Sequence, residues 1–121
     1  MPRRVLIADD SDIVRGLIRS FLAGRFPGME VCGETANGRE TVKEALRLGP
    51  DLVILDVLMP DLNGIEVASI LKKSLPHTKL ILFTMYGEYV KTLATAAGVD
   101  VVLPKPNGLT PLMEALEEVM D

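Results

Sequence analysis

Several residue types are scarce in this chain of 121 residues, and each shortage excludes a class of protein. Cys32 is the only cysteine, so no internal disulfide can form, and its apolar neighbour Val31 indicates a buried small side chain rather than a reactive thiol. There is no tryptophan, aromatic residues make up 4% of the chain and the net charge is −4. Because bases would find neither a stacking surface nor a basic patch, we expect no direct binding of nucleic acid.

Long hydrophobic runs are also missing. No apolar run approaches the roughly 20 residues that a membrane-spanning helix needs. The amino terminus leads into a short apolar run that stops at Asp9 and Asp10, so it lacks the pattern of a signal peptide. With 48% hydrophobic and 25% charged residues, the composition is typical of a globular protein. We expect one cytoplasmic domain over residues 1–121, without membrane contact.

Two hydrophobic periodicities alternate along the chain. Short apolar runs at 5–8, 52–55, 80–83 and 99–103 are typical of strands that are buried on both faces, and an interrupted run at 29–34 fits an edge strand. Five stretches with helical spacing follow these runs. Ser11 and Thr110 are expected to cap two of the helices, the second with Pro111 at its first position. Gly49 and Gly98 are expected to end two others.

The strict alternation of five strands with five helices predicts an α/β fold with a parallel sheet and right-handed crossovers. A closed eight-fold barrel needs about 250 residues, so an open doubly wound sheet remains. Ligands of such sheets bind beyond the carboxyl ends of the strands, at the point where the strand order reverses.

Five polar residues stand at or just past the ends of the apolar runs: Asp9, Asp10, Asp56, Thr84 and Lys105. Taken singly, Asp9, Asp10 or Thr84 is most simply a turn or cap residue. Together they indicate one composite site. Three converging carboxylates repel one another unless a cation is bound, and an all-oxygen site of this kind suits a hard ion such as Mg²⁺.

The remaining two side chains suggest what else this site binds. A hydroxyl and an ammonium that face a metal-bound carboxylate make a cradle for a tetrahedral dianion. Asp56 could then act as the nucleophile. The chemistry indicated is phosphoryl transfer to Asp56.

Over essentially its whole length the chain resembles the receiver domains of two-component response regulators. The resemblance rests on VLIADD at 5–10, LDVLMPDLNG at 55–64, FT at 83–84 and KP at 105–106, in family order and at family spacings. It implies a flavodoxin-like sheet in the order 2-1-3-4-5. The resemblance implies that Asp10, Asp56 and the Leu58 carbonyl bind Mg²⁺ directly and that Asp9 contributes through water. It also implies that Asp56 is phosphorylated and that Thr84 and Lys105 contact the phosphoryl group. A cis peptide bond between Lys105 and Pro106 is implied as well.

Two departures from the family pattern lead to hypotheses. Many receivers carry an aromatic residue in the fifth strand that swings inward on phosphorylation, and Val102 stands at that position. We expect the switch to work through the backbone after Thr84 instead, because a β-branched side chain has little rotamer freedom. Leu58 and Tyr86 border the expected path of water to the phosphoryl group, and both are bulky. Either they slow self-hydrolysis by excluding water, or they merely face solvent or a partner.

The resemblance also implies partners. His77 is the only histidine, and it lies in an expected surface turn, so the phosphate must come from a separate histidine kinase or phosphotransfer protein, docking near the first helix. The last helix carries more apolar residues than one buried face needs: Leu109, Leu112, Met113, Leu116, Val119 and Met120. Core packing explains most of them, and a homodimer or an output contact through the face formed by helix four, strand five and helix five is the second interpretation. Residues 31–34 and 84–90 are similar to receivers that govern helix-turn-helix transcription outputs.

Three alternatives stay open. No output domain follows Asp121, so the chain is either a stand-alone receiver, for example a phosphorelay intermediate, or the receiver of a longer regulator. An enzyme of the phosphoaspartate phosphatase class would usually carry a second acid two residues after the nucleophile, where this chain has Leu58. Flavin binding is disfavoured because Asp9 and Asp10 would repel a phosphate group. We expect a binding module switched by phosphorylation rather than an enzyme.

Overall fold

One parallel sheet organises the chain in the computed structural model, which describes residues 3–105 and 108–120. Its strands lie in the order β2-β1-β3-β4-β5. They are β1 (Arg3–Ala8), β2 (Met29–Thr35), β3 (Leu52–Leu55), β4 (Lys79–Thr84) and β5 (Val101–Pro104). The order confirms the predicted flavodoxin-like, doubly wound α/β fold, with β2 and β5 at the edges.

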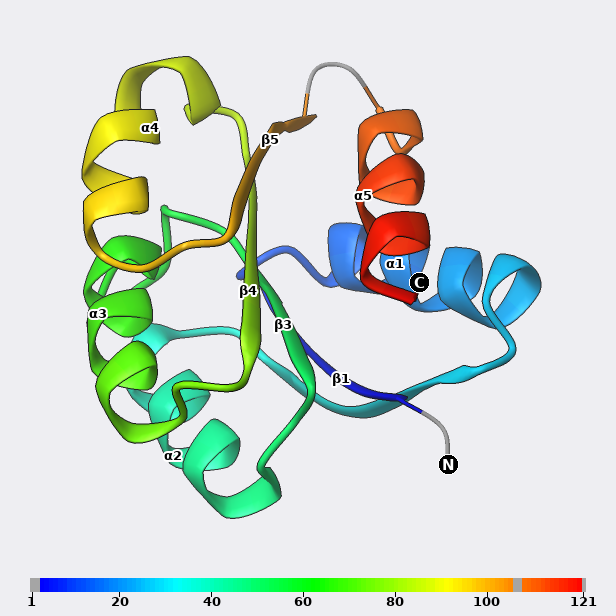
Figure 1. The fold of residues 1–121 in the computed structure, drawn as a ribbon, viewed down its shortest axis with the longest axis horizontal. Helices are drawn as coiled ribbons and strands as arrows, with labels where there is room; N and C mark the ends of the chain where they lie inside the picture. The colour runs from blue at the N-terminus through cyan, green and yellow to red at the C-terminus, as the bar shows by residue number, and fades with distance from the viewer. Residues whose placement is uncertain (1–2, 106–107, 121) are drawn as a thin grey trace.

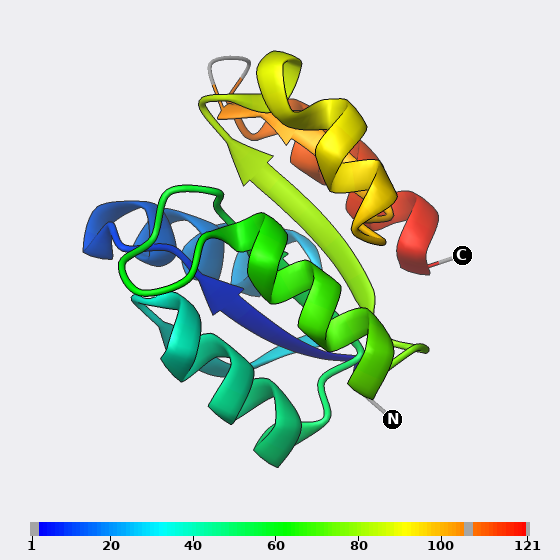
Figure 2. The same ribbon diagram turned by 90° about the vertical axis from the view of Figure 1, so that its left-hand side faces the viewer.

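Helices cover both faces of this sheet (Figure 1). One layer holds α2 (Gly38–Leu48), α3 (Gly64–Ser74) and α4 (Gly87–Ala96), which lie side by side in Figure 2, and the other holds α1 (Asp12–Arg25) and α5 (Thr110–Met120). Successive strand residues point to opposite faces, so Leu6 packs into the first layer and Ile7 into the second. Within the described ranges, no helix combines the length and the apolar character that crossing a membrane requires.

The crossover helices place a crevice at the carboxyl ends of β1 and β3. These strands are neighbours in the sheet, but α1 leaves β1 toward one face while α3 follows β3 on the other. The strand order therefore reverses at this point, and the connecting loops separate there. Asp9 and Asp56, the residues directly after β1 and β3, both lie at this crevice.

Three of the helices begin with a side-chain cap, and α4 does not. Ser11 accepts a hydrogen bond from the Val14 amide, Asn37 caps α2 in the same way, and Asn63 forms a capping box with Glu66. At α4 the N-cap position is Tyr86, whose side chain makes no capping bond. The predicted cap at Ser11 and the predicted end of α2 at Gly49, which is left-handed, are confirmed.

Several predicted boundaries differ by one or two residues, and at two of them a local hydrogen bond marks the observed start. β5 begins at Val101 rather than at residue 99, because the carboxylate of Asp100 accepts the Leu80 amide and interrupts the ladder before the strand starts. α5 begins at Thr110, which is therefore its first helical residue rather than its cap, and the carbonyl of Leu109 accepts the Met113 amide. Of the apolar residues predicted on α5, the side chains of Val119 and Met120 lie outside the described part.

Apolar residues of α1 and α4 are only partly used by the core. Ile18 and Leu22 of α1 are fully buried, but Ile13 and Leu17 are 76% and 55% exposed. On α4, Leu93 is 63% exposed. Both helices therefore present apolar surface to solvent beyond what packing against the sheet requires.

The edge strand β2 is interrupted at Cys32, as its composition predicted. The register with β1 shifts between Val5 and Leu6, which leaves Cys32 as the extra residue of a bulge. Its thiol is half-buried rather than fully buried and donates to the Val5 carbonyl. Burial raises the pKa of this thiol, so the reactive thiolate is disfavoured.

Candidate functional site

The ammonium of Lys105 joins the ends of two central strands. Its Nζ lies 2.7 Å from Oδ2 of Asp9 and 2.7 Å from Oδ2 of Asp56. The lysine side chain is 13% exposed, and the two carboxylates are 4% and 8% exposed. Water screens such buried charges poorly, so each interaction is stronger than a surface ion pair. The fold thus brings together three of the residues that the sequence predicted at one site.

Backbone amides fix the direction of both buried carboxylates. Oδ1 of Asp9 accepts the Ser11 amide at 2.9 Å, and Oδ1 of Asp56 accepts the Val57 amide at 2.7 Å. The main chain beside them is also held, because the Asp56 amide donates to the Ala8 carbonyl. One oxygen of each carboxylate is therefore committed to the protein backbone, and the other faces Lys105.

Burial and pairing act in opposite directions on the ionised groups. Burial raises the pKa of Asp9, and the hydrogen bonds from Lys105 and Ser11 offset this only in part. Burial alone would lower the pKa of Lys105, but the carboxylates of Asp56 and Asp9 together outweigh it and raise that pKa. The lysine is consequently held as a cation, while ionisation of Asp9 costs more free energy than it would in water, and further positive charge nearby would reduce this cost.

A third carboxylate completes an acidic cluster. Asp9, Asp10 and Asp56 each offer an oxygen, and these ligand atoms lie within 4.8 Å of one another. Asp10 is exposed, so the cluster opens to solvent on its side. Three carboxylate oxygens on a solvent-accessible crevice fit a hard cation that keeps part of its water shell, as Mg²⁺ does. The predicted convergence of these aspartates is confirmed, and the cluster could hold a metal ion.

Thr84 ends β4 next to this cluster and is fully buried. Its Oγ1 accepts the Tyr86 amide at 3.3 Å, and the hydrogen bonds found among the described residues do not include one from Thr84 to the carboxylates. Leu58 and Tyr86, the two rim residues, are 53% and 43% exposed. Val102 is half-buried and packs against the core on the α4 side of the sheet. The peptide bond between Lys105 and Pro106 lies outside the described residues.

Two glycines hold the loop after Asp56 in ways that hydrophobic patterning could not reveal. A Cβ atom on Gly64 would lie 2.1 Å from the Asp56 carbonyl oxygen, and one on Gly38 would lie 2.1 Å from the Leu62 carbonyl oxygen. The amide of Gly64 donates to Val57, and the amide of Gly38 donates to Pro60. Gly64 therefore joins the two ends of the loop, and Gly38 holds its middle, through close backbone contacts that only glycine permits.

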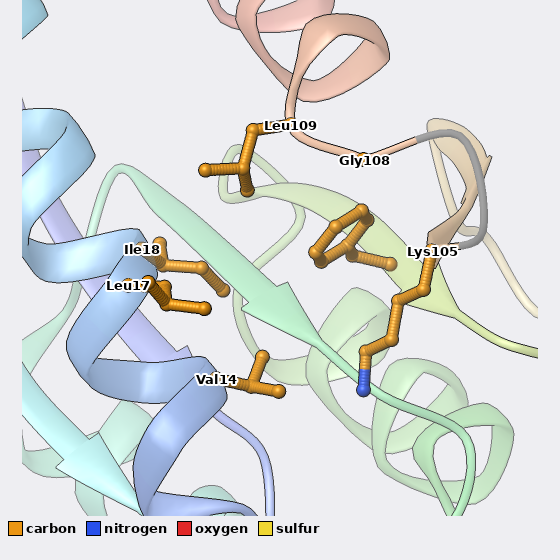
Figure 3. Close-up of a pocket in the computed structure, with 7 residues that line it drawn as sticks. Val14, Leu17, Ile18, Lys105, Gly108 and Leu109 are labelled. Atoms are coloured by element: carbon orange, nitrogen blue, oxygen red, sulfur yellow. The ribbon is translucent and has the colours of Figure 1, made fainter.

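Lys105 also borders an apolar groove between α1 and the start of α5. The groove has a volume of about 180 Å³. Figure 3 shows Val14, Leu17 and Ile18 of α1 on one side and Leu109 and Lys105 on the other. A partner that inserts an apolar side chain here would sit beside the lysine that contacts Asp56.

The sequence is similar to those of known response regulators. The family described as the response regulator receiver domain matches residues 5–117. The chain is 35% identical over 120 residues to the chemotaxis protein CheY of Thermotoga maritima, with 98% of each chain covered. It is 34% identical over 119 residues to the response regulator protein VraR of Staphylococcus saprophyticus, covering 98% of this chain and 56% of VraR.

Solved structures agree with this similarity. A DNA-binding response regulator of the LuxR family from Staphylococcus aureus superimposes with a TM-score of 0.90 at 25% identity, covering 98% of this chain and 99% of that one. The chain spans little more than half the length of VraR, whereas it spans nearly the full length of CheY.

The burial of the Asp9 carboxylate predicts a gain in stability on removing its charge. Asp9→Asn should raise the melting temperature in metal-free buffer by about 4 °C, which corresponds to about 1 kcal/mol in a domain of this size, because it removes the cost of burying this charge, which the contacts with Lys105 and Ser11 offset only in part, and the amide oxygen can still accept from Ser11. Calorimetry with a chelator checks this. Glu117→Gln removes one exposed carboxylate elsewhere and should change little; an equal or lower melting temperature for Asp9→Asn would contradict the prediction.

Proposed function

This chain belongs to the response regulator receiver domain family, and on that premise we propose that its Asp56 accepts a phosphoryl group from a histidine kinase or histidine phosphotransfer protein in a Mg²⁺-dependent reaction. Residues 1–121 act as one receiver domain in this proposal. The observation that carries it is the ammonium of Lys105, which lies 2.7 Å from the carboxylates of both Asp9 and Asp56 in a crevice that also exposes Asp10.

The transfer itself needs few parts. A carboxylate oxygen of Asp56 attacks the phosphorus of a phosphohistidine, the phosphorus–nitrogen bond breaks, and the imidazole nitrogen leaves and takes up a proton. Mg²⁺, held by Asp10, Asp56 and the Leu58 carbonyl with Asp9 acting through water, would neutralise charge on the phosphoryl oxygens. The protein's own contribution is positioning and electrostatics.

Lys105 and Thr84 sense the transferred group. The lysine neutralises Asp56 before the reaction and pairs with a phosphoryl oxygen after it. The Thr84 hydroxyl accepts from the Tyr86 amide, which leaves its own proton to donate to a phosphoryl oxygen. Movement of Thr84 toward the phosphoryl group would break the 3.3 Å bond to Tyr86, the residue at the N-cap of α4. The backbone after Thr84 thereby becomes the route by which the signal leaves the site.

The face of α4 is the surface that an output would read. Tyr89 and Leu93 are 86% and 63% exposed, and Met85 and Tyr86 extend this apolar surface toward Thr84. Val102 lies beneath α4 and is β-branched, which favours a shift of backbone over a rotamer swing. We propose that this face, with β5 and α5, contacts a helix-turn-helix output domain in transcriptional control or a second copy of the chain. Similarity to a LuxR-family DNA-binding regulator supports the transcriptional output.

A stand-alone phosphorelay intermediate would use the same site and the same chemistry, and near full-length similarity to CheY supports it as the alternative. An enzyme fits the site less well. A phosphoaspartate phosphatase would need an acid two residues after Asp56, and Leu58 cannot donate a proton there.

We propose docking of the phosphodonor at α1, where Ile13 and Leu17 are exposed beside the groove that ends at Lys105.

The phospho-acceptor assignment predicts complete loss of the response in one variant. Asp56→Asn should abolish both labelling by a phosphoramidate donor and the chemical-shift changes that BeF₃⁻ with Mg²⁺ produces in the unaltered protein, because the amide cannot act as the nucleophile. Asp51→Asn makes the same change at the opposite edge of the sheet and should leave both intact. Phosphorylation that persists in Asp56→Asn, detected by mass spectrometry, would overturn the assignment.

The apolar rim predicts a long-lived phosphorylated form. Replacing both rim residues, Leu58→Asn with Tyr86→Glu, should accelerate dephosphorylation by about tenfold or more, because polar side chains can align the attacking water. The rate is measured by removing the phosphodonor and recording how fast the phosphorylated form disappears. Leu46→Asn changes an equally exposed leucine on α2 and serves as the control. An unchanged rate in the double variant would show that the rim does not control hydrolysis.

The α4 face predicts self-association that depends on phosphorylation. With BeF₃⁻ and Mg²⁺ the chain should dimerise, and Leu93→Lys should weaken the dimer roughly 30-fold, since burying a leucine contributes about 2 kcal/mol. Light scattering after size-exclusion chromatography measures this. Leu46→Lys should dimerise normally. A monomer under activating conditions, or an undiminished dimer for Leu93→Lys, would exclude this face as the dimer contact.

A further inference from the structure

Arg15 of α1 contacts the backbone of the acidic site although it does not reach the carboxylates themselves. Its Nη1 donates to the carbonyl oxygen of Asp9, its Nη2 pairs with Asp12, and its Nε lies 3.4 Å from Oε1 of Glu34 on β2. The side chain is 13% exposed, which is unusual burial for an arginine near a protein surface. We propose that Arg15 is a positioning residue for the metal site, acting on Asp10 through the peptide that joins it to Asp9.

The planar peptide between Asp9 and Asp10 explains how Arg15 can position Asp10. A peptide unit is planar, so fixing the direction of the Asp9 carbonyl also fixes the amide and Cα of Asp10. The other side of Asp9 is held as well, because its amide donates to the Thr35 carbonyl. Asp10 is exposed, and among the described residues its carboxylate takes part in no hydrogen bond or ion pair. Its approach to Asp9 and Asp56 therefore depends on the main chain that carries it.

Charge does not explain the arrangement. A bare guanidinium near a cation site would weaken binding by repulsion, but Arg15 is neutralised by Asp12 and Glu34, and Glu34 also pairs with Arg19. Two arginines and two acids leave this group with no net charge. What remains is the planar guanidinium, whose several donors bind three acceptors at once: one on α1, one in the loop after β1 and one on β2. A lysine has the same charge but not this geometry.

This inference rests on the Mg²⁺-dependent function proposed above and is tested by binding of Mg²⁺ alone. Arg15→Lys should raise the Mg²⁺ dissociation constant about tenfold, the loss typical of residues that orient a metal ligand. Calorimetric titration gives the constant, and amide chemical shifts of Asp10 and Ser11 report the site directly. Arg19→Lys is the matched control, since Arg19 contacts Glu34 but not Asp9, and its constant should stay within twofold of the unaltered protein.

A second readout separates positioning from general destabilisation. Phosphorylation of Arg15→Lys by a phosphoramidate should recover nearly fully at saturating Mg²⁺, because the chemistry at Asp56 is intact and only the affinity has fallen. A dissociation constant for Arg15→Lys within twofold of the unaltered protein would overturn the inference, as would equal weakening in Arg19→Lys or failure to recover at saturating Mg²⁺. If the unaltered protein itself binds no Mg²⁺, the proposed function fails instead.

Discussion

The site depends on one buried cation that is shared by two carboxylates. Without Lys105, Asp9 and Asp56 would be like charges in a poorly solvated crevice, and both burial and repulsion would raise the pKa of at least one of them. The ammonium binds them together, but one positive charge does not balance two carboxylates, and Asp10 adds a third. The fold therefore tolerates the cluster and still attracts a further cation. That residual charge links the stability of the domain to the ligand it is proposed to bind.

Much of the fold was predictable because its strands are buried on both faces. Continuous apolar runs at β1, β3 and β4 can only lie in the middle of a sheet covered by helices, and the structure places them there. The boundaries that failed, at β5 and α5, depend on single side-chain and backbone hydrogen bonds from Asp100 and Leu109, which leave no periodic signal. The strand order came from family resemblance, not from periodicity.

Some residues of the site could be predicted from the sequence, and others could not. Asp9, Asp56 and Lys105 were predictable because each follows an apolar run, and parallel strands end at one edge. Gly38 and Gly64 were not singled out, since their importance lies in a close approach to a distant backbone that hydrophobic patterns do not record. Arg15 was missed because it flanks the apolar stripe of α1 and resembles an ordinary surface arginine until its buried contact with Asp9 is seen.

The missing cap on α4 has a further consequence. Helices α1, α2 and α3 each satisfy amides of the first turn through a side chain, and such a cap contributes on the order of 1 kcal/mol. The first turn of α4 has no side-chain cap, and it follows Tyr86 directly, the residue whose amide donates to Thr84. Local opening should therefore cost less free energy at this turn than at the start of α1, α2 or α3, so its amides should exchange with solvent hydrogen before those that begin these three helices. A conformational switch at this turn would break fewer hydrogen bonds than one at the start of a capped helix.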